Sequence, residues 1–130
     1  REIKFRAKQM GTREWRYGFL SKRSDYHTIR EQEITDCAYH TYDVISETIG
    51  QFTGLTDKNG VDIYEGDIVK HFDHAEIIRE VIFMKGSFGY WTGEEFISYA
   101  SNYHFEWQDL HKSDKIEVIG SIHSNPELIK

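Results

Sequence analysis

The sequence predicts a mainly β protein: an N-terminal antiparallel hairpin packed with a small SH3-like, barrel-like C-terminal β part, followed by a short terminal helix. Three observations support this fold class. Apolar and polar residues alternate near the N-terminus, short Ile- and Val-rich runs recur from residue 48 onward, and turn residues separate these runs at close spacing. Such a pattern is typical of small barrels and sandwiches.

The N-terminal hairpin is predicted from residues 3–8 and 15–20, which flank a loop containing Gly11. In each segment alternate residues are apolar or aromatic, which is the period of a half-buried strand. We expect Phe5 to share one buried face with Trp15, Tyr17 and Phe19. The opposite face would then be an outward, basic interaction surface made of Lys4, Arg6, Lys8 and Arg16.

Residues 21–47 are polar and weakly patterned, and they predict no element. After them, strands are predicted in the runs TIGQFTGL, GDIVKHF, EIIREVIFM, GSFGYW and KIEVIGSI. Residues 94–112 mix aromatic and polar side chains without a clear period. The sequence Asn125-Pro126-Glu127 fits the N-cap, the first position and the acidic first turn of a short helix.

The expected organisation is a hairpin segment with an irregular region (1–47) and a barrel-like core (48–130), together forming one folding unit. Charge is uneven along the chain, whose net charge is −6. Residues 1–35 hold 9 Lys/Arg and 5 Asp/Glu, whereas the remaining residues hold 7 and 17. This asymmetry is informative about partners rather than about the fold.

An acidic stretch, TGLTDKNGVDIYEGDIV, raises the question of a metal or catalytic site at residues 53–69. Turn chemistry explains it better. Type I turns favour Asp at the first position, and a following Gly accepts positive φ, so Asp57, Asn59 and Gly60 form a hairpin turn. A second turn contains Gly66 and Asp67. A calcium-binding EF-hand loop that begins at Asp57 would need an acidic or amide residue at position 61 and glycine at position 62. The sequence has Val61 and Asp62 there, which disfavours such a loop.

Histidine and cysteine spacings provide weak metal candidates. One is His71 with Asp73 and His74, and another is Cys37 with His40. Neither spacing is completed by a second cluster that would supply four ligands. Cys37 has no neighbouring residue that marks it as an activated nucleophile. We therefore expect no bound metal, no cofactor and no catalytic residue.

The cellular setting is predicted from composition. Cys37 is the only cysteine, so it forms no internal disulfide, as expected for a reducing cytoplasm. No apolar run approaches the ~18 residues that span a membrane. The opening REIKFRAK is strand-like rather than a signal peptide.

Four blocks give the chain a resemblance to the YopX family of phage and prophage proteins. They are REIKFRA, TIGQFTGLTDKNGVDIYEGDIVKH, EVIFMKGSFGYW and IEVIGSIHSNPELIK. Lys8 departs from this pattern, because the family usually has Trp there. The resemblance implies an all-β fold with a barrel-like C-terminal part and expression in a bacterial cytoplasm. It implies no reaction and no catalytic residues.

Three functions are weighed on these grounds. The favoured one is a non-catalytic protein-interaction module that binds a host or phage protein and also self-associates through its basic hairpin. The alternative is a nucleic-acid binder that uses the basic, aromatic N-terminal strands. A metal-dependent hydrolase built on the acidic turns is the least favoured.

Overall fold

The computed structural model describes residues 3–32, 39–72, 77–100, 107–108 and 112–129. Strands dominate these residues, and the two helical segments are short 3-10 turns. The mainly β fold class predicted from the sequence is therefore confirmed. The chain divides into two compact units, residues 1–52 and 53–130, with the boundary inside one strand.

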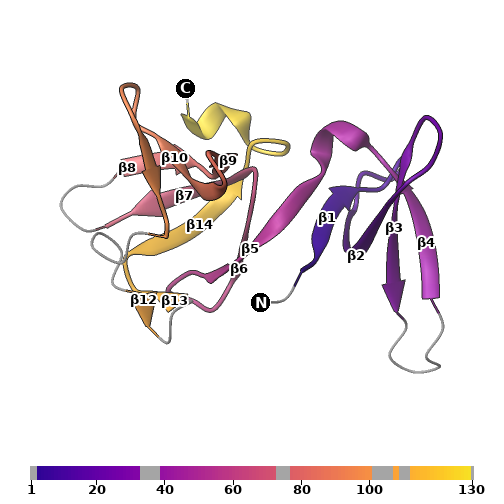
Figure 1. Ribbon diagram of the computed structural model, residues 1–130, viewed down its shortest axis with the longest axis horizontal. Helices are drawn as coiled ribbons and strands as arrows, with labels where there is room; N and C mark the ends of the chain where they lie inside the picture. The colour runs from indigo at the N-terminus through magenta and orange to yellow at the C-terminus, as the bar shows by residue number, and fades with distance from the viewer. Residues whose placement is uncertain (1–2, 33–38, 73–76, 101–106, 109–111, 130) are drawn as a thin grey trace. The chain divides into compact units, whose positions relative to one another are not determined.

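The N-terminal unit is an antiparallel sheet in which consecutive strands are neighbours, in the order β1-β2-β3-β4, with the start of β5 beside β1 (Figure 1). The β1–β2 hairpin expected from the sequence is present. Residues 21–47, which predicted no element, contain two of the strands. The elements are β1 (Phe5–Lys8), β2 (Trp15–Lys22), β3 (His27–Gln32), β4 (Tyr39–Val44), the 3-10 turn η1 (Ser46–Thr48) and β5 (Gly50–Thr56).

The core of this unit lies on the inner face of its sheet. Ala7, Ile29 and Val44 are buried there, one each from β1, β3 and β4. The sheet curls so that the end of β4 returns to the end of β1, where Gln9 bridges to Val44. Thr48 in η1 stabilises this contact between the two strand ends, because its hydroxyl accepts a hydrogen bond from the Lys8 amide at 2.8 Å.

The register of β1 against β2 corrects the expected hairpin faces. Arg6 pairs with Tyr17 and Lys8 with Trp15, so the basic side of β1 shares a face with the aromatic side of β2. Phe5 pairs with Gly18 and lies on the inner face instead. The prediction that Phe5, Trp15, Tyr17 and Phe19 form one buried face is wrong. Residues that are directly paired on neighbouring strands project to the same face of the sheet. The pairing register therefore decides which side of one strand lies next to which side of the other.

The C-terminal unit contains two three-stranded antiparallel sheets, β11-β10-β9 and β14-β7-β8. The end of β5 pairs with β6 and, in parallel, with β13. The elements are β6 (Asp62–Tyr64), β7 (Asp67–His71), β8 (Ile77–Glu80), β9 (Ile82–Met84), β10 (Ser87–Trp91), β11 (Phe96–Ser98), β12 (Trp107–Gln108), β13 (Lys112–Ser113), β14 (Ile116–Ser121) and the 3-10 turn η2 (Pro126–Ile129).

The core of the C-terminal unit joins these sheets. Its buried side chains are Ile63, Val69, Val81, Phe88, Tyr99 and Ile116. The strands described here do not close into a barrel. The expected terminal helix is present as η2, in which the Asn125 carbonyl accepts a hydrogen bond from the Leu128 amide at 3.1 Å.

The acidic stretch folds as two turns. Gly60 has φ of +80° and its amide donates to the Asp57 carbonyl, as the turn pattern predicts. The Asp57 carboxylate is fully buried; its Oδ1 accepts hydrogen bonds from the amides of Asn59 and Val61. Its Oδ2 accepts a third bond, from the Val118 amide of β14 at 2.9 Å. Asp57 therefore holds the hairpin turn and attaches it to a distant strand.

In the second turn the aspartate follows the glycine and accepts a hydrogen bond from an amide that precedes it. Gly66 has φ of +92°, and Asp67 Oδ2 accepts a hydrogen bond from the Tyr64 amide at 2.7 Å. The Asp67 side chain is buried. Both carboxylates thus compensate their removal from water by bonding backbone amides.

Candidate binding surface on the N-terminal sheet

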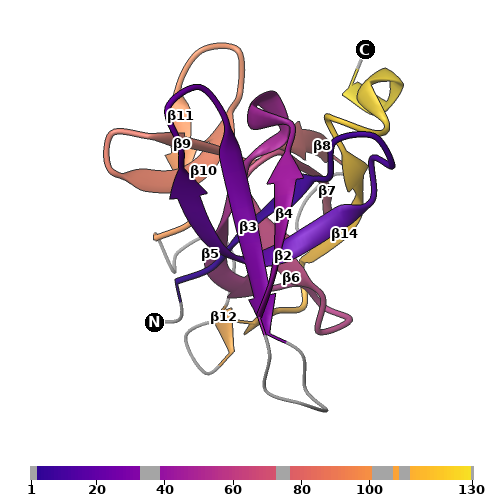
Figure 2. The same cartoon turned by 90° about the vertical axis from the view of Figure 1, so that its right-hand side faces the viewer.

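The outer face of the N-terminal sheet carries four exposed side chains from three neighbouring strands. Tyr17 and Phe19 alternate along β2, while Arg30 and Tyr39 come from β3 and β4. The residues Tyr17, Phe19 and Tyr39 are 44%, 55% and 52% exposed. Arg30 is exposed as well. We call these four residues the aromatic–arginine face; Figure 2 shows the strands that carry it.

Arg30 occupies the centre of this face by register. It lies opposite Phe19 on β2, and opposite Thr41 on β4. Its guanidinium carbon is 5.7 Å from the centroid of the Phe19 ring and 4.6 Å from that of Tyr39. Guanidinium groups are attracted to the negative faces of aromatic rings. Two rings from different strands therefore hold one cation in place.

Arg6 and Lys8 are two buried cations that also lie over an aromatic ring, that of Trp15. The Arg6 guanidinium carbon lies 4.2 Å from the Trp15 ring, and the Lys8 ammonium lies 5.4 Å from it. Only 7% of each basic residue is exposed. Burial lowers the pKa of Lys8, and repulsion from Arg13 and Arg6 lowers it further.

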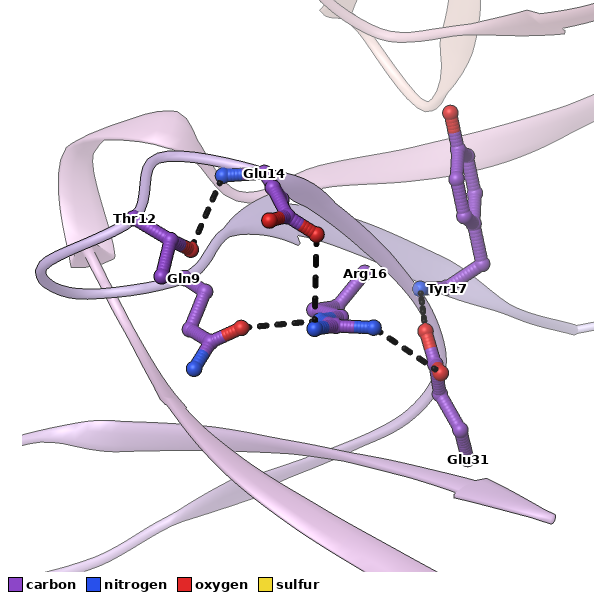
Figure 3. Close-up of polar contacts among 6 residues, drawn as sticks. All are labelled: Gln9, Thr12, Glu14, Arg16, Tyr17 and Glu31. Carbon is purple, nitrogen blue, oxygen red and sulfur yellow. Dashed lines mark hydrogen bonds and ion pairs between the residues drawn. The ribbon is translucent and has the colours of Figure 1, made fainter. Parts of the chain in front are cut away.

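Arg16 is held by a polar network on the inner side of the sheet (Figure 3). Its guanidinium donates to Gln9 Oε1 at 2.9 Å and forms ion pairs with Glu14 and Glu31 at 3.5 and 3.8 Å. It also lies over the Tyr42 ring, 4.0 Å from the centroid. These contacts connect the β1–β2 loop with β2, β3 and β4.

Glu31 helps to fix the neighbouring surface residue. Its Oε2 accepts a hydrogen bond from the Tyr17 amide at 2.8 Å, while its other oxygen faces Arg16. In Figure 3 the Tyr17 ring points away from this polar group. The network therefore anchors the backbone beneath the aromatic–arginine face without taking part in the face itself.

The basic interaction surface expected from the sequence is not an exposed surface. Arg6 and Lys8 are buried against Trp15, and Arg16 is held in its network. Lys4 is half-buried, with its ammonium 4.7 Å from the Phe52 ring. These cations already contact aromatic or acidic groups of their own chain, and self-association through them stays a prediction.

Sequence reasoning missed Arg30 and Tyr39, since both lie in the region that predicted no element. A weak signal was present: in β3 the apolar Ile29 is preceded by a β-branched residue and followed by Arg30. Register, which no local pattern reports, brings Arg30 opposite Phe19.

His71, the metal-ligand candidate in the C-terminal unit, is packed into the protein interior against two tyrosines. His71 is buried and its Nε2 lies 3.1 Å from the Tyr99 hydroxyl, beside the Tyr90 ring. Burial, with Tyr90 and Asp67 nearby, raises the pKa of Tyr99 well above its ordinary value. No cluster of three potential metal ligands occurs in the described ranges. Cys37, Asp73 and His74 lie outside those ranges.

A pocket of about 240 Å³ also lies in the C-terminal unit. Its lining includes Arg79, Glu80, Trp91 and Ile129. Burial raises the pKa of the Glu80 carboxyl, and the Glu65 carboxylate adds to this effect.

Fold and surface together define a small, two-unit, mainly antiparallel β protein that presents an arginine between aromatic rings. Residues 4–130 match the family model described as YopX protein, so the chain belongs to the YopX family. This confirms the resemblance found in its sequence blocks.

A solved relative has the same fold. The crystal structure of protein EF1440 from Enterococcus faecalis aligns with a TM-score of 0.62 and 25% sequence identity, covering 99% of each chain. No curated protein matches the chain significantly. Among the residues described, none forms a helix long and apolar enough to span a membrane.

Proposed function

We propose that this protein is a non-catalytic protein-interaction module, encoded by a phage or prophage and acting in the bacterial host, that binds its partner through the aromatic–arginine face. One observation carries the proposal: an exposed arginine lies between two exposed rings, and a third exposed ring stands on the same sheet face. Tyr and Arg are enriched among the residues that dominate protein–protein binding energy.

The charge of the surface favours a protein over a nucleic acid. Residues 1–52 hold 9 Lys/Arg and 8 Asp/Glu, so this unit is almost neutral. Arg6 and Lys8 are buried, and Asp43 is exposed on the same side as Arg30, by the alternation of β4. Non-specific nucleic-acid binding depends on several cations that each neutralise a phosphate. A single exposed arginine among rings suits a protein interface better.

Affinity capture from a nuclease-treated bacterial lysate tests the proposed surface. Proteins retained by the wild type should be lost from a Phe19→Ser/Tyr39→Ser variant, because the partner loses its aromatic contacts. The matched control is Met10→Ser, since Met10 is 54% exposed in the same unit but lies in the β1–β2 loop. Identical sets of captured proteins for all three baits would contradict the proposal. Capture that requires intact nucleic acid would favour the alternative function.

A further inference from the structure

We propose that Arg30 is the anchor for a single carboxylate in an otherwise uncharged, partly apolar segment of the protein partner. This inference rests on the proposed function and names the chemistry of the group that the face recognises. It assigns separate tasks to the face: the rings provide apolar contact area, and the guanidinium supplies charge and hydrogen bonds.

The first argument is the state of the Arg30 guanidinium. The rings of Phe19 and Tyr39 are its contacts, and within the described part of the chain no carboxylate pairs with it. The contrast with Arg16, which has two carboxylate partners, is direct. A guanidinium presents five N–H donors in its plane, and ring contacts do not consume them. The donors of Arg30 are therefore available to an incoming anion.

The second argument is preorganisation. A free arginine side chain loses substantial rotamer freedom when it is fixed in a complex. At this site the rings of Phe19 on β2 and Tyr39 on β4 already lie beside the guanidinium. Both strands are hydrogen-bonded to β3, the strand that carries Arg30. The backbone beneath is held closely, because a Cβ on Gly18 would lie only 2.3 Å from the Arg30 carbonyl oxygen. An anion thus meets an arginine whose position is largely set.

The third argument selects a carboxylate over the phosphates of a nucleic-acid strand. A bidentate guanidinium–carboxylate pair needs one arginine, and it matches the single exposed cation of this face. A polyanion would approach Asp43 as well, which is exposed on the same side of β4. An isolated carboxylate flanked by apolar residues avoids that repulsion and uses the rings.

Fluorescence polarisation with defined probes tests this inference on the full chain. The probes are a labelled Ser-Val-Ser-Val-Glu-Val-Ser-Val-Ser peptide with blocked ends, the same peptide with Gln in place of Glu, and a twelve-residue oligothymidylate. We expect the Glu peptide to bind about tenfold more tightly than the Gln peptide, the size of effect given by one charge-assisted pair. In Arg30→Gln this preference should disappear, whereas Arg30→Lys should retain part of it.

The matched control is Arg23→Gln, which removes an equal charge from an exposed residue just after β2. It should leave the preference for the Glu peptide intact. Equal loss in Arg23→Gln and Arg30→Gln would overturn the inference, because the effect would then reflect net charge. Oligothymidylate binding that depends on Arg30, without a preference for the Glu peptide, would overturn it in favour of nucleic acid.

The two proposals can fail separately. If Arg30→Gln leaves peptide binding unchanged while Phe19→Ser/Tyr39→Ser still abolishes lysate capture, the carboxylate anchor is wrong and the interaction surface stands. If capture is unaffected by the ring substitutions, the surface itself is wrong. Circular dichroism of each variant establishes that the sheet is folded, and the exposure of all three side chains makes this the expected result.

Discussion

The guanidinium of Arg6 lies 4.2 Å from the centroid of the Trp15 ring, and the two residues come from adjacent strands of the N-terminal hairpin. Lys8 lies over the same ring, so one indole contacts two buried cations. Desolvated cations of this kind are costly unless such contacts compensate them. Trp15 is therefore expected to be a structural residue rather than part of the binding surface.

Replacing Trp15 tests this assignment. Trp15→Ala should lower the free energy of unfolding by about 3 kcal/mol, through lost apolar burial and lost cation–π contacts. Tyr17→Ala, on the same strand and face but 44% exposed, should cost less than about 1 kcal/mol. Urea denaturation monitored by circular dichroism measures both. Equal costs would show that the Arg6–Trp15 contact contributes little.

Gly18 is predicted to be required for the pairing of β2 with β3. In Gly18→Ala the new Cβ would lie 2.3 Å from the Arg30 carbonyl oxygen, so the strands must separate. We expect a loss of about 2–4 kcal/mol, typical of overpacking combined with backbone strain. Gly11→Ala is the control, because a Cβ there meets nothing within 4 Å although its φ is also positive. Similar denaturation midpoints for the two variants would refute the steric explanation.

The Asp57 carboxylate is predicted to contribute more to the free energy of unfolding than the side chain of an ordinary turn residue does. Asp57→Ala leaves the amides of Asn59, Val61 and Val118 without their acceptor, and it should cost about 3 kcal/mol or more. Asp57→Asn keeps one acceptor oxygen and should lie between alanine and wild type. Hydrogen exchange at the Val118 amide provides a local measurement. Unchanged protection there would contradict the proposed link between the turn and β14.

Glu80 is predicted to make stability depend on pH. Its folded-state pKa is raised, so the folded protein binds more protons than the unfolded chain between the unfolded value, about 4.3, and the higher folded value. Stability contributed by this group is therefore lost as pH rises through that window. Glu80→Gln should have a higher denaturation midpoint than wild type at pH 7.

The gain in stability of Glu80→Gln over wild type should shrink as the pH falls below about 4.3, because the Glu80 carboxyl is then neutral in both the folded and the unfolded protein. Glu94→Gln, at an exposed position, should show no comparable gain at pH 7. A gain of Glu80→Gln that is the same at both pH values would mean that charge burial is not its cause.

Local sequence signals identified much of the architecture. Alternation predicted β1 and β2, Ile- and Val-rich runs predicted β7 and β14, and Asn125-Pro126 predicted the terminal turn. The turn at Asp57 and Gly60 was also predictable, because it depends on a few consecutive residues. Residues 21–47 were not, since β3 and β4 are polar strands stabilised by pairing with neighbours rather than by a strong apolar pattern.

The sequence by itself determined that two alternating strands form a hairpin, but only the tertiary structure decided which sides of those strands coincide. A shift of one residue in pairing exchanges the two faces of a strand. The observed register places Arg6 and Lys8 beside Trp15, and the pairing of β2 with β3 places Arg30 beside Phe19. Tyr39 joins them through β4. The candidate surface is therefore a product of long-range strand pairing, in which residues distant along the chain are brought together by backbone hydrogen bonds that local sequence does not specify.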